Sequence, residues 1–328
     1  SGRHGPAQGK HLKSTEKSQN MVKMIEVSQD QAEQRLDNFL LARLKGVPKS
    51  HVYRLLRSGQ VRVNKGRKKP GYRIQAGDRV RIPPVRAASR EAAVIPDAVL
   101  ETLQKAVLFE NEDILVLNKP AGLAVHGGSE LKFGIIEAMR ALFPGQYFEL
   151  VHRLDRETSG CLVLARNRKT LELLHGALRN NRPADSGRVE KTYLTLLAGQ
   201  WQLGSKTVEL PLRKFRRGGE HRVEISEDGH RAVSHFKLLQ HYRNASLMQV
   251  QIDTGRTHQI RVHAAACGHP VAGDPRYGDD AFNREMRKHG LCRLFLHASH
   301  IILPIGEGLS VHAPLSEDLS NLLDNIAT

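Results

Sequence analysis

The stretch VHRLDRETSG, residues 151–160, places one carboxylate, Asp155, between two arginines and directly before a Glu-Thr-Ser-Gly turn. An aspartate in this position most often caps its own backbone within the turn. Alternatively, the carboxylate takes part in chemistry, and the arginines support its ionised form. Spacing alone does not decide between these interpretations, so the rest of the chain has to be considered.

Length and composition limit the class of protein. The chain has 328 residues, enough for two domains with a sizeable core. It contains no run of 18 apolar residues and no signal peptide, so we expect a soluble, cytoplasmic protein without a membrane partner. Its three cysteines, Cys161, Cys267 and Cys292, lie far apart with no CxxC pair. That spacing argues against a disulfide framework and against a cysteine-based zinc site.

The positive charge is concentrated at one end of the chain. Residues 1–90 hold 21 Lys and Arg against 6 Asp and Glu, a net +15, whereas the other 238 residues contribute only +1. A basic segment joined to a neutral body indicates a polyanionic partner held by one module. Within that segment, residues 1–24 are polar and without periodicity, and we expect them to form a disordered basic tail.

A small module is predicted after the tail. Two helices are indicated, the first ending near residues 46–48 and the second capped by Ser50 and ended by Gly59. Short strands follow at 61–63 and 80–82. The apolar positions at helical spacing are Leu36, Phe39, Leu40 and Leu44 in the first helix, and Val52, Leu55 and Leu56 in the second.

This module carries many cations with few acids among them. Such a surface favours binding of a nucleic-acid phosphate backbone over a merely solvated surface. The segment GVPKSHVYRLLRSGQVRVN, residues 46–64, resembles the S4 RNA-binding module, and we assign residues 33–83 to it. The residues expected to contact RNA are Ser50, Arg54, Arg57, Arg62, Lys65, Lys68 and Lys69.

Residues 84–105, which begin with a Pro-rich stretch, are expected to be a linker, and residues 106–328 a second domain. Strands are indicated at 114–117, 161–165, 192–197 and 247–252, and a helix capped by Asn167 follows the second of these. Strands and helices interleave irregularly. We therefore predict an α+β fold with a mixed, mostly antiparallel sheet.

Three kinds of site can be weighed from the motifs. Ser159, His152 and Asp155 are close in sequence, but no GxSxG elbow supports a hydrolase triad. His258 and His263 lack the HExxH spacing of a zinc site, so no metal is expected. The glycines at 199 and 204 are followed by Ser-Lys, the reverse of the order in a phosphate-binding loop.

The segment TGRTHQIRVHAAACG, residues 254–268, predicts a helix that Thr257 caps and that runs to Gly268. Arg256, His258 and Arg261 would then crowd a helix N-terminus, where the macrodipole opposes cations. An anion in front of them, either a carboxylate or a phosphate, would relieve this tension. The alternative is that the three side chains extend into solvent.

A family resemblance bears on these alternatives. HRLDRETSG resembles the motif of pseudouridine synthases of the ribosomal large-subunit family, and further blocks agree in order: ILVLNKPAGLAVH at 114–126, EKTYLTLL at 190–197 and GRTHQIRVH at 255–263. The resemblance implies that Asp155 is the catalytic carboxylate, that Arg261 pairs with it and that Tyr193 lies against the uracil. It also implies that Arg153 enters the RNA stack and that no cofactor is needed. Arg256 and His258, at the predicted helix N-terminus, are expected to contact RNA in a central cleft.

The expected function is therefore the isomerisation of specific uridines to pseudouridine in large-subunit (23S) ribosomal RNA, by a monomer. One alternative is the same chemistry on another RNA, such as tRNA. The other is a non-catalytic rRNA-binding or ribosome-assembly factor, which would have no need for Asp155, Tyr193 and Arg261 together.

Overall fold

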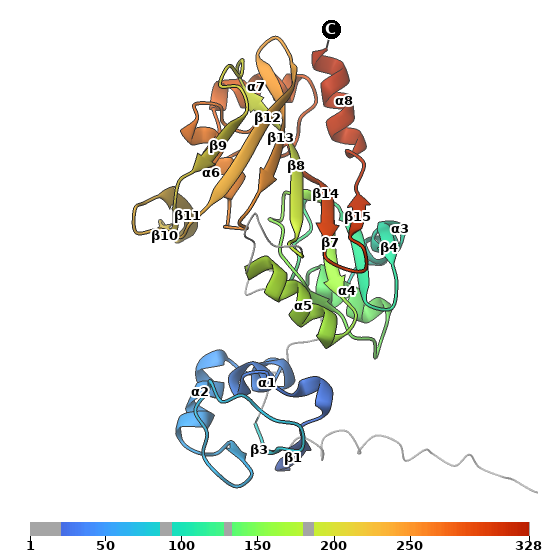
Figure 1. The fold of residues 1–328 in the computed structure, drawn as a ribbon, viewed down its shortest axis with the longest axis vertical. Helices are drawn as coiled ribbons and strands as arrows, with labels where there is room; N and C mark the ends of the chain where they lie inside the picture. Colours follow the sequence, from blue (N-terminus) through green and yellow to red (C-terminus); the bar gives the residue numbers. More distant parts are fainter. Residues whose placement is uncertain (1–20, 86–93, 128–132, 180–186, 328) are drawn as a thin grey trace, which may run out of the picture. The chain divides into compact units, whose positions relative to one another are not determined.

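The computed structural model describes residues 21–85, 94–127, 133–179 and 187–327. These form two compact units, one within Ser1–Ala93 and one within Val94–Thr328 (Figure 1). Within the described ranges, no helix combines the length and apolar composition needed to cross a membrane. Most of the predicted tail, residues 1–20, lies outside the described residues.

The described part of the N-terminal unit holds two α-helices and a small antiparallel sheet, as predicted. Its elements are β1 (Lys23–Glu26), the short 3-10 helix η2 (Gln29–Gln31), α1 (Leu36–Arg43), α2 (Lys49–Arg57), β2 (Arg62–Val63) and β3 (Arg79–Ile82). Strand β1 begins inside the segment expected to be disordered. It is ordered because Ile25 pairs with Val80 of β3 and packs against the core of this unit.

Ser50 does not cap α2, contrary to the prediction. The helix begins at Lys49, and Pro48 precedes it with a φ of −57°, close to the value its ring imposes. The Pro48 carbonyl oxygen accepts hydrogen bonds from the amides of His51 and Val52. Ser50 is consequently an exposed residue of the first helical turn.

The C-terminal unit is built on one large sheet. Its helices are α3 (Asp97–Lys105), α4 (Ile135–Leu142), α5 (Arg168–Arg179), α6 (Gln259–Ala266), α7 (Asp280–Lys288) and α8 (Glu317–Ile326). Its strands are β4 (Val107–Glu110), β5 (Ile114–Lys119), β6 (Glu149–Leu150), β7 (Ser159–Ala165), β8 (Glu190–Ala198), β9 (Lys206–Glu209), β10 (Leu212–Arg217), β11 (Glu220–Ile225), β12 (Val233–His241), β13 (Ala245–Ile252), β14 (Leu296–Leu303) and β15 (Leu309–His312).

Among the described residues, ten of these strands form the large sheet, in the order β4-β5-β7-β14-β8-β13-β12-β9, with β6 beside β7 and β15 beside β14. Among the described strand pairs of this sheet, only that of β7 with β14 is parallel. The prediction of a mixed, mostly antiparallel sheet is therefore confirmed. Strands β10 and β11 form a separate hairpin that projects beside the sheet (Figure 1).

Strands β5 and β7 lie in the interior, with apolar side chains on both faces. Along β5, Leu115 and Leu117 face one cluster of buried residues, while Ile114 and Val116 face another. This alternation follows from the two-residue period of a strand. Helices α3 and α4 contribute to the first cluster and α5 to the second.

Helix α3 occupies part of the segment expected to be a linker. Leu103 is fully buried, and Val99 and Leu100 pack with it against the cluster that includes Leu115. The apolar residues at 99, 100 and 103 share one helical face, which packs this segment onto the C-terminal unit. The chain divides between Ala93 and Val94, inside the segment of residues 84–105 expected to be a linker, and α3 belongs to the C-terminal unit.

Candidate active site

The loop that carries Asp155 lies between β6 and β7 and is held through its main chain. Lys119 Nζ donates a hydrogen bond to the Arg156 carbonyl oxygen (2.8 Å), and Arg293 Nη1 donates to that of Glu157 (3.0 Å). The Thr158 amide donates to the Asp155 carbonyl oxygen (3.0 Å). Main-chain atoms therefore close this turn. The Asp155 carboxylate does not cap it, and it accepts no hydrogen bond from the described residues.

The Thr-Ser-Gly sequence after Asp155 fixes the start of β7 against β14. Gly160 has a φ of +111° and pairs with Ala298 of β14. A Cβ atom at this position would lie 2.1 Å from the Ala298 carbonyl oxygen. Only glycine fits this close approach. The contact with β14 therefore fixes the position of the chain directly after the loop that carries Asp155.

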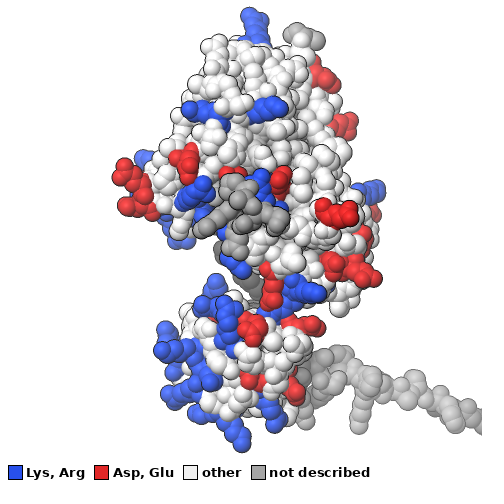
Figure 2. Space-filling view, in the orientation of Figure 1, with Lys and Arg blue, Asp and Glu red and all other residues white. Residues whose placement is uncertain are grey.

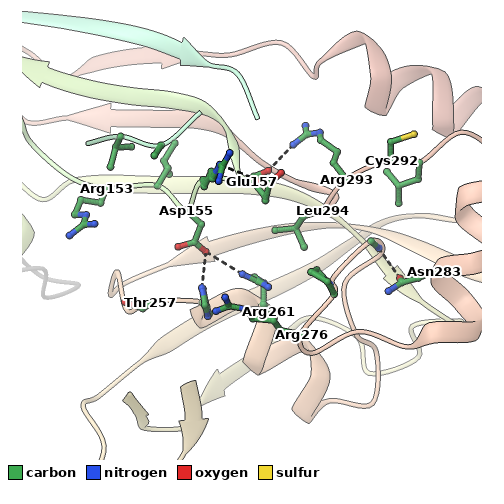
Figure 3. A pocket seen from close by; sticks show the side chains of 18 of the residues that line it. Arg153, Asp155, Glu157, Thr257, Arg261, Arg276, Asn283, Cys292, Arg293 and Leu294 are labelled. Carbon is green, nitrogen blue, oxygen red and sulfur yellow. Dashed lines mark hydrogen bonds and ion pairs between the residues drawn. The ribbon is translucent and has the colours of Figure 1, made fainter. Parts of the chain in front are cut away.

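Arg261 lies on α6, in front of Asp155, but its hydrogen-bonded partner is a different carboxylate. Its Nε and Nη2 atoms each donate to Asp274 over 2.8 Å, while Nη1 lies 3.8 Å from Asp155 Oδ2 (Figure 3). Burial opposes ionisation of Asp274, but hydrogen bonds from Arg261 outweigh it and hold the pKa of Asp274 below its usual value. Asp274 therefore orients the guanidinium, whose third nitrogen faces Asp155.

His258, and not Thr257 as predicted, is the residue that precedes α6. Its backbone is left-handed (φ 54°), so the helix starts one residue later than the sequence indicated. Its Nε2 atom lies 4.0 Å from Asp155 Oδ2. Burial lowers the pKa of His258 to about 4, and the ring is neutral at neutral pH. His258 is therefore not one of the cations expected at this helix start.

Tyr193 of β8 and Asp155 line the same cavity, which has a volume of about 650 Å³. The tyrosine is 7% exposed, and burial raises its pKa, so the hydroxyl remains protonated. Leu178, Ile252 and Leu296 give this cavity apolar walls. Lys191, which the sequence reasoning did not single out, also lines it, and burial lowers the pKa of Lys191 to about 8.

A larger cleft of about 1160 Å³ is also lined by Asp155 (Figure 3). Among the described residues, three acids line it, Asp155, Glu157 and Asp280. The basic residues that line it are Arg153, Arg156, Lys214, Arg256, Arg261, Arg276, Arg284, Arg287 and Arg293. The body that is nearly neutral by sequence count thus carries a strongly positive cleft, because distant segments bring their arginines together.

The other sites considered from the sequence are not formed. His152 Nε2 accepts a hydrogen bond from the Val163 amide, and burial lowers its pKa to about 3. Ser159 Oγ lies 2.7 Å from His297 Nδ1, away from His152, so there is no triad with Asp155. His263 lies against the Leu210 carbonyl oxygen, and no cluster of possible metal ligands occurs among the described residues.

The expected RNA-binding residues of the N-terminal unit are mostly exposed. Arg54 and Arg57 project from α2, and Lys65, Lys68 and Lys69 belong to the loop after β2. Arg62 differs, because its guanidinium donates to the carbonyl oxygens of residues 59 and 65 and so braces this loop. Lysine and arginine side chains are prominent on the visible face of this unit (Figure 2).

Comparison with known proteins defines the class. The sequence profile of the RNA pseudouridylate synthase family matches residues 113–266, and the S4 domain profile matches residues 34–80. Among solved structures, human RNA pseudouridylate synthase domain-containing protein 4 is 25% identical with a TM-score of 0.59. The match covers 70% of this chain and 96% of the human chain. Human RNA pseudouridylate synthase domain-containing protein 1 is 29% identical with a TM-score of 0.56. That match covers 68% of this chain and 88% of the human chain.

Closer relatives extend the match to nearly the whole chain. "Ribosomal large subunit pseudouridine synthase C" of Pasteurella multocida is 50% identical over 309 residues, 92% of this chain and 93% of that protein. The protein of the same name from Escherichia coli K12 is 47% identical over 314 residues, 93% and 97% of the two chains. The chain therefore belongs to the RNA pseudouridylate synthase family, and the resemblance seen in its motifs is confirmed. It is an RNA pseudouridine synthase with an S4 domain.

Proposed function

We propose that this enzyme converts specific uridines of large-subunit (23S) ribosomal RNA to pseudouridine, with Asp155 as the catalytic carboxylate. The observation that carries the proposal is the position of Asp155. Its carboxylate lines both cavities, accepts no hydrogen bond from the described residues, and has Arg261 on one side with Tyr193 in the same cavity. The substrate RNA is proposed from the names of the relatives that are about 50% identical.

The reaction breaks the N1–C1′ bond of uridine, turns the base and joins C5 to C1′. N1 gains a proton and C5 loses one, so the change is an isomerisation without oxidation or hydrolysis. Asp155 would act on the sugar or the base while Arg261 balances its charge without hydrogen-bonding it. The ring of Tyr193 would lie against the uracil, and its protonated hydroxyl would help move the proton from C5.

The target base has to leave the RNA stack to reach Asp155, which costs a few kcal/mol of unstacking. Arg153 is exposed and lines both cavities, which supports a role in filling the position that the base leaves. Arg256 lines both cavities too and would hold a phosphate next to the target. The cations of the N-terminal unit would supply further phosphate contacts.

A cytoplasmic location accompanies this proposal, because the proposed substrate is made and assembled there. The expectation of a monomer stays a prediction, which light scattering of the purified protein would check.

The experiment that tests the function is carbodiimide primer-extension mapping of pseudouridine in ribosomal RNA. Cells that lack the gene would be complemented with wild type, with Asp155→Asn, or with Asp97→Asn as a matched control at an exposed position of α3. We expect stops on large-subunit RNA that wild type and Asp97→Asn restore and Asp155→Asn does not. Stops on tRNA alone would replace the proposed substrate, and restoration by Asp155→Asn would refute the proposed role of this carboxylate.

A further inference from the structure

His258 lies between two groups that its ring nitrogens can bind. Nδ1 is 2.8 Å from the Tyr277 hydroxyl oxygen, and Nε2 is 4.0 Å from Asp155 Oδ2. The residue is held in this place by a left-handed backbone, which histidine adopts more readily than most side chains. The sequence had suggested a cation that contacts RNA, but the structure places the ring against the carboxylate.

The hydrogen-bond pattern around Tyr277 identifies the position of the ring proton. The Val223 amide of β11 donates to the Tyr277 hydroxyl oxygen over 3.0 Å. The hydroxyl hydrogen is then free to point at His258 Nδ1, which accepts it, and this leaves the single proton of the neutral ring on Nε2. In the opposite arrangement the hydroxyl would accept twice, and its own hydrogen would lack a described partner.

Burial favours the neutral form of the His258 ring, and the surrounding charges act in both directions. Arg261 and Arg276 oppose protonation of His258, whereas Asp155 and Asp274 favour it. Burial is the largest effect and acts in the same direction as the arginines. A neutral N–H can orient a carboxylate without forming a second ion pair beside the one from Arg261, so the carboxylate keeps its reactivity toward the substrate.

We propose that His258 is a positioning residue for the reaction, a neutral imidazole whose Nε2–H hydrogen-bonds Asp155 when uridine is bound, in a tautomer set by Tyr277. This proposal rests on the proposed role of Asp155 as the catalytic carboxylate. The present 4.0 Å separation shortens by about 1 Å in the complex, as active-site hydrogen bonds commonly do when substrate binds. Val223 lies on the hairpin β10–β11, and Lys214 of the same hairpin lines the larger cleft. This hairpin therefore determines which ring nitrogen of His258 carries the proton.

Two substitutions at position 258 separate this role from a structural one. Glutamine can present an N–H near the position of Nε2, whereas asparagine is too short and retains only the place of Nδ1. For the backbone the order is reversed, because asparagine tolerates the left-handed conformation better than glutamine. We expect kcat of His258→Asn to fall by about 10- to 100-fold, the effect of a hydrogen bond to a charged group, and that of His258→Gln to fall by less.

A purely structural role predicts the opposite order, with His258→Asn the more active variant and the more stable one, and that result would overturn the proposal. Kcat is to be measured with saturating rRNA fragment, and thermal unfolding would accompany each assay. The Asp155→Asn variant distinguishes a failure of the proposed role of His258 from a failure of the proposed function. If it remains active, the proposed function fails, whatever the order at position 258.

The proton position can be measured without any reaction. Two-bond ¹⁵N–¹H NMR spectra of the full-length protein at pH 7 should contain, among the signals of neutral Nε2–H histidines, one signal that is lost in His258→Asn and is thereby assigned to His258. In Tyr277→Phe this signal should shift toward the Nδ1–H form, whereas Tyr242→Phe, whose side chain lines neither cavity, should leave it unchanged. A protonated ring or a pure Nδ1–H form in the wild type would refute the proposal.

Discussion

Asp274 is the residue on which the position of Arg261 depends, and its replacement by asparagine gives a quantitative test. The Asp274 side chain is fully buried and accepts two hydrogen bonds from Arg261, whose side chain is 7% exposed. Its Oδ1 also accepts the amides of Arg276 and Tyr277. Asparagine keeps those two bonds but turns an N–H₂ group toward Arg261 Nε and leaves the guanidinium without its paired charge.

Removing one partner of a buried ion pair typically costs about 3–5 kcal/mol. The C-terminal unit, Val94–Thr328, spans 235 residues. In a domain of this size, that loss corresponds to a fall in Tm of about 6–20 °C. Arg261 would also be free to turn toward Asp155 and bind the carboxylate directly, so we expect kcat to fall as well.

The stability difference should depend on pH in a defined direction. Because the folded pKa of Asp274 is held below its usual value, its contribution is complete above about pH 4 and is lost as the pH falls further. The difference between wild type and Asp274→Asn should therefore shrink by about 1.4 kcal/mol for each pH unit below 4.

Urea unfolding of both proteins from pH 7 to pH 3 measures this difference. The matched control is Glu149→Gln, which breaks a half-exposed ion pair with Arg140 and should cost less than about 1 kcal/mol. A loss below 1 kcal/mol for Asp274→Asn at pH 7, or a difference that does not change on acidification, would show that the buried pair does not hold Arg261 in place.

Three further predictions concern other parts of the chain. Replacing Arg54 and Arg57 together by alanine should lower the slope of log RNA affinity against log salt by about 1.5–2, and an unchanged slope would exclude α2 from the phosphate contact. Gly160→Ala should lower the free energy of unfolding by about 3 kcal/mol, because its Cβ would meet the Ala298 carbonyl oxygen; unchanged thermal unfolding would contradict this packing. Burial lowers the pKa of Lys191 to about 8, so kcat/KM of the wild type should fall as the pH rises through 8, whereas Lys191→Gln should lack this step; identical profiles would show that the charge of Lys191 is not used.

The elements with a clear apolar period were predictable from the sequence. Both helices of the N-terminal unit and strands such as β5 and β7 follow local hydrophobic patterns and occur where expected. Helix α3 was missed because the prolines before it indicated a linker, and only the packing of Leu103 reveals its place in the core. Strand β1 was missed because its order depends on pairing with β3, some 55 residues later in the chain.

The site was less accessible to sequence reasoning, because its parts are distant in the chain. Asp155 and Arg261 could be connected only through the family resemblance, and the 3.8 Å between them depends on how β7 and α6 pack. Asp274 lies in a Gly-Asp-Pro turn that carries no sign of an ion pair. The positive cleft was hidden by a net charge near zero, since acids elsewhere in the unit cancel its arginines in any sum over the sequence.

The way in which the Asp155 loop is held has a consequence for how such an enzyme can change its RNA target. Lys119 and Arg293 donate hydrogen bonds to the carbonyl oxygens of residues 156 and 157. Every amino acid provides such an oxygen. The side chains at these two positions line the cleft, and Arg156 Nε also donates to the Gly122 carbonyl oxygen, but the bonds from Lys119 and Arg293 are to the backbone. The residues next to Asp155 can therefore change, and with them the lining of the cleft, while the two bonds that hold the loop carrying the proposed catalytic carboxylate are kept.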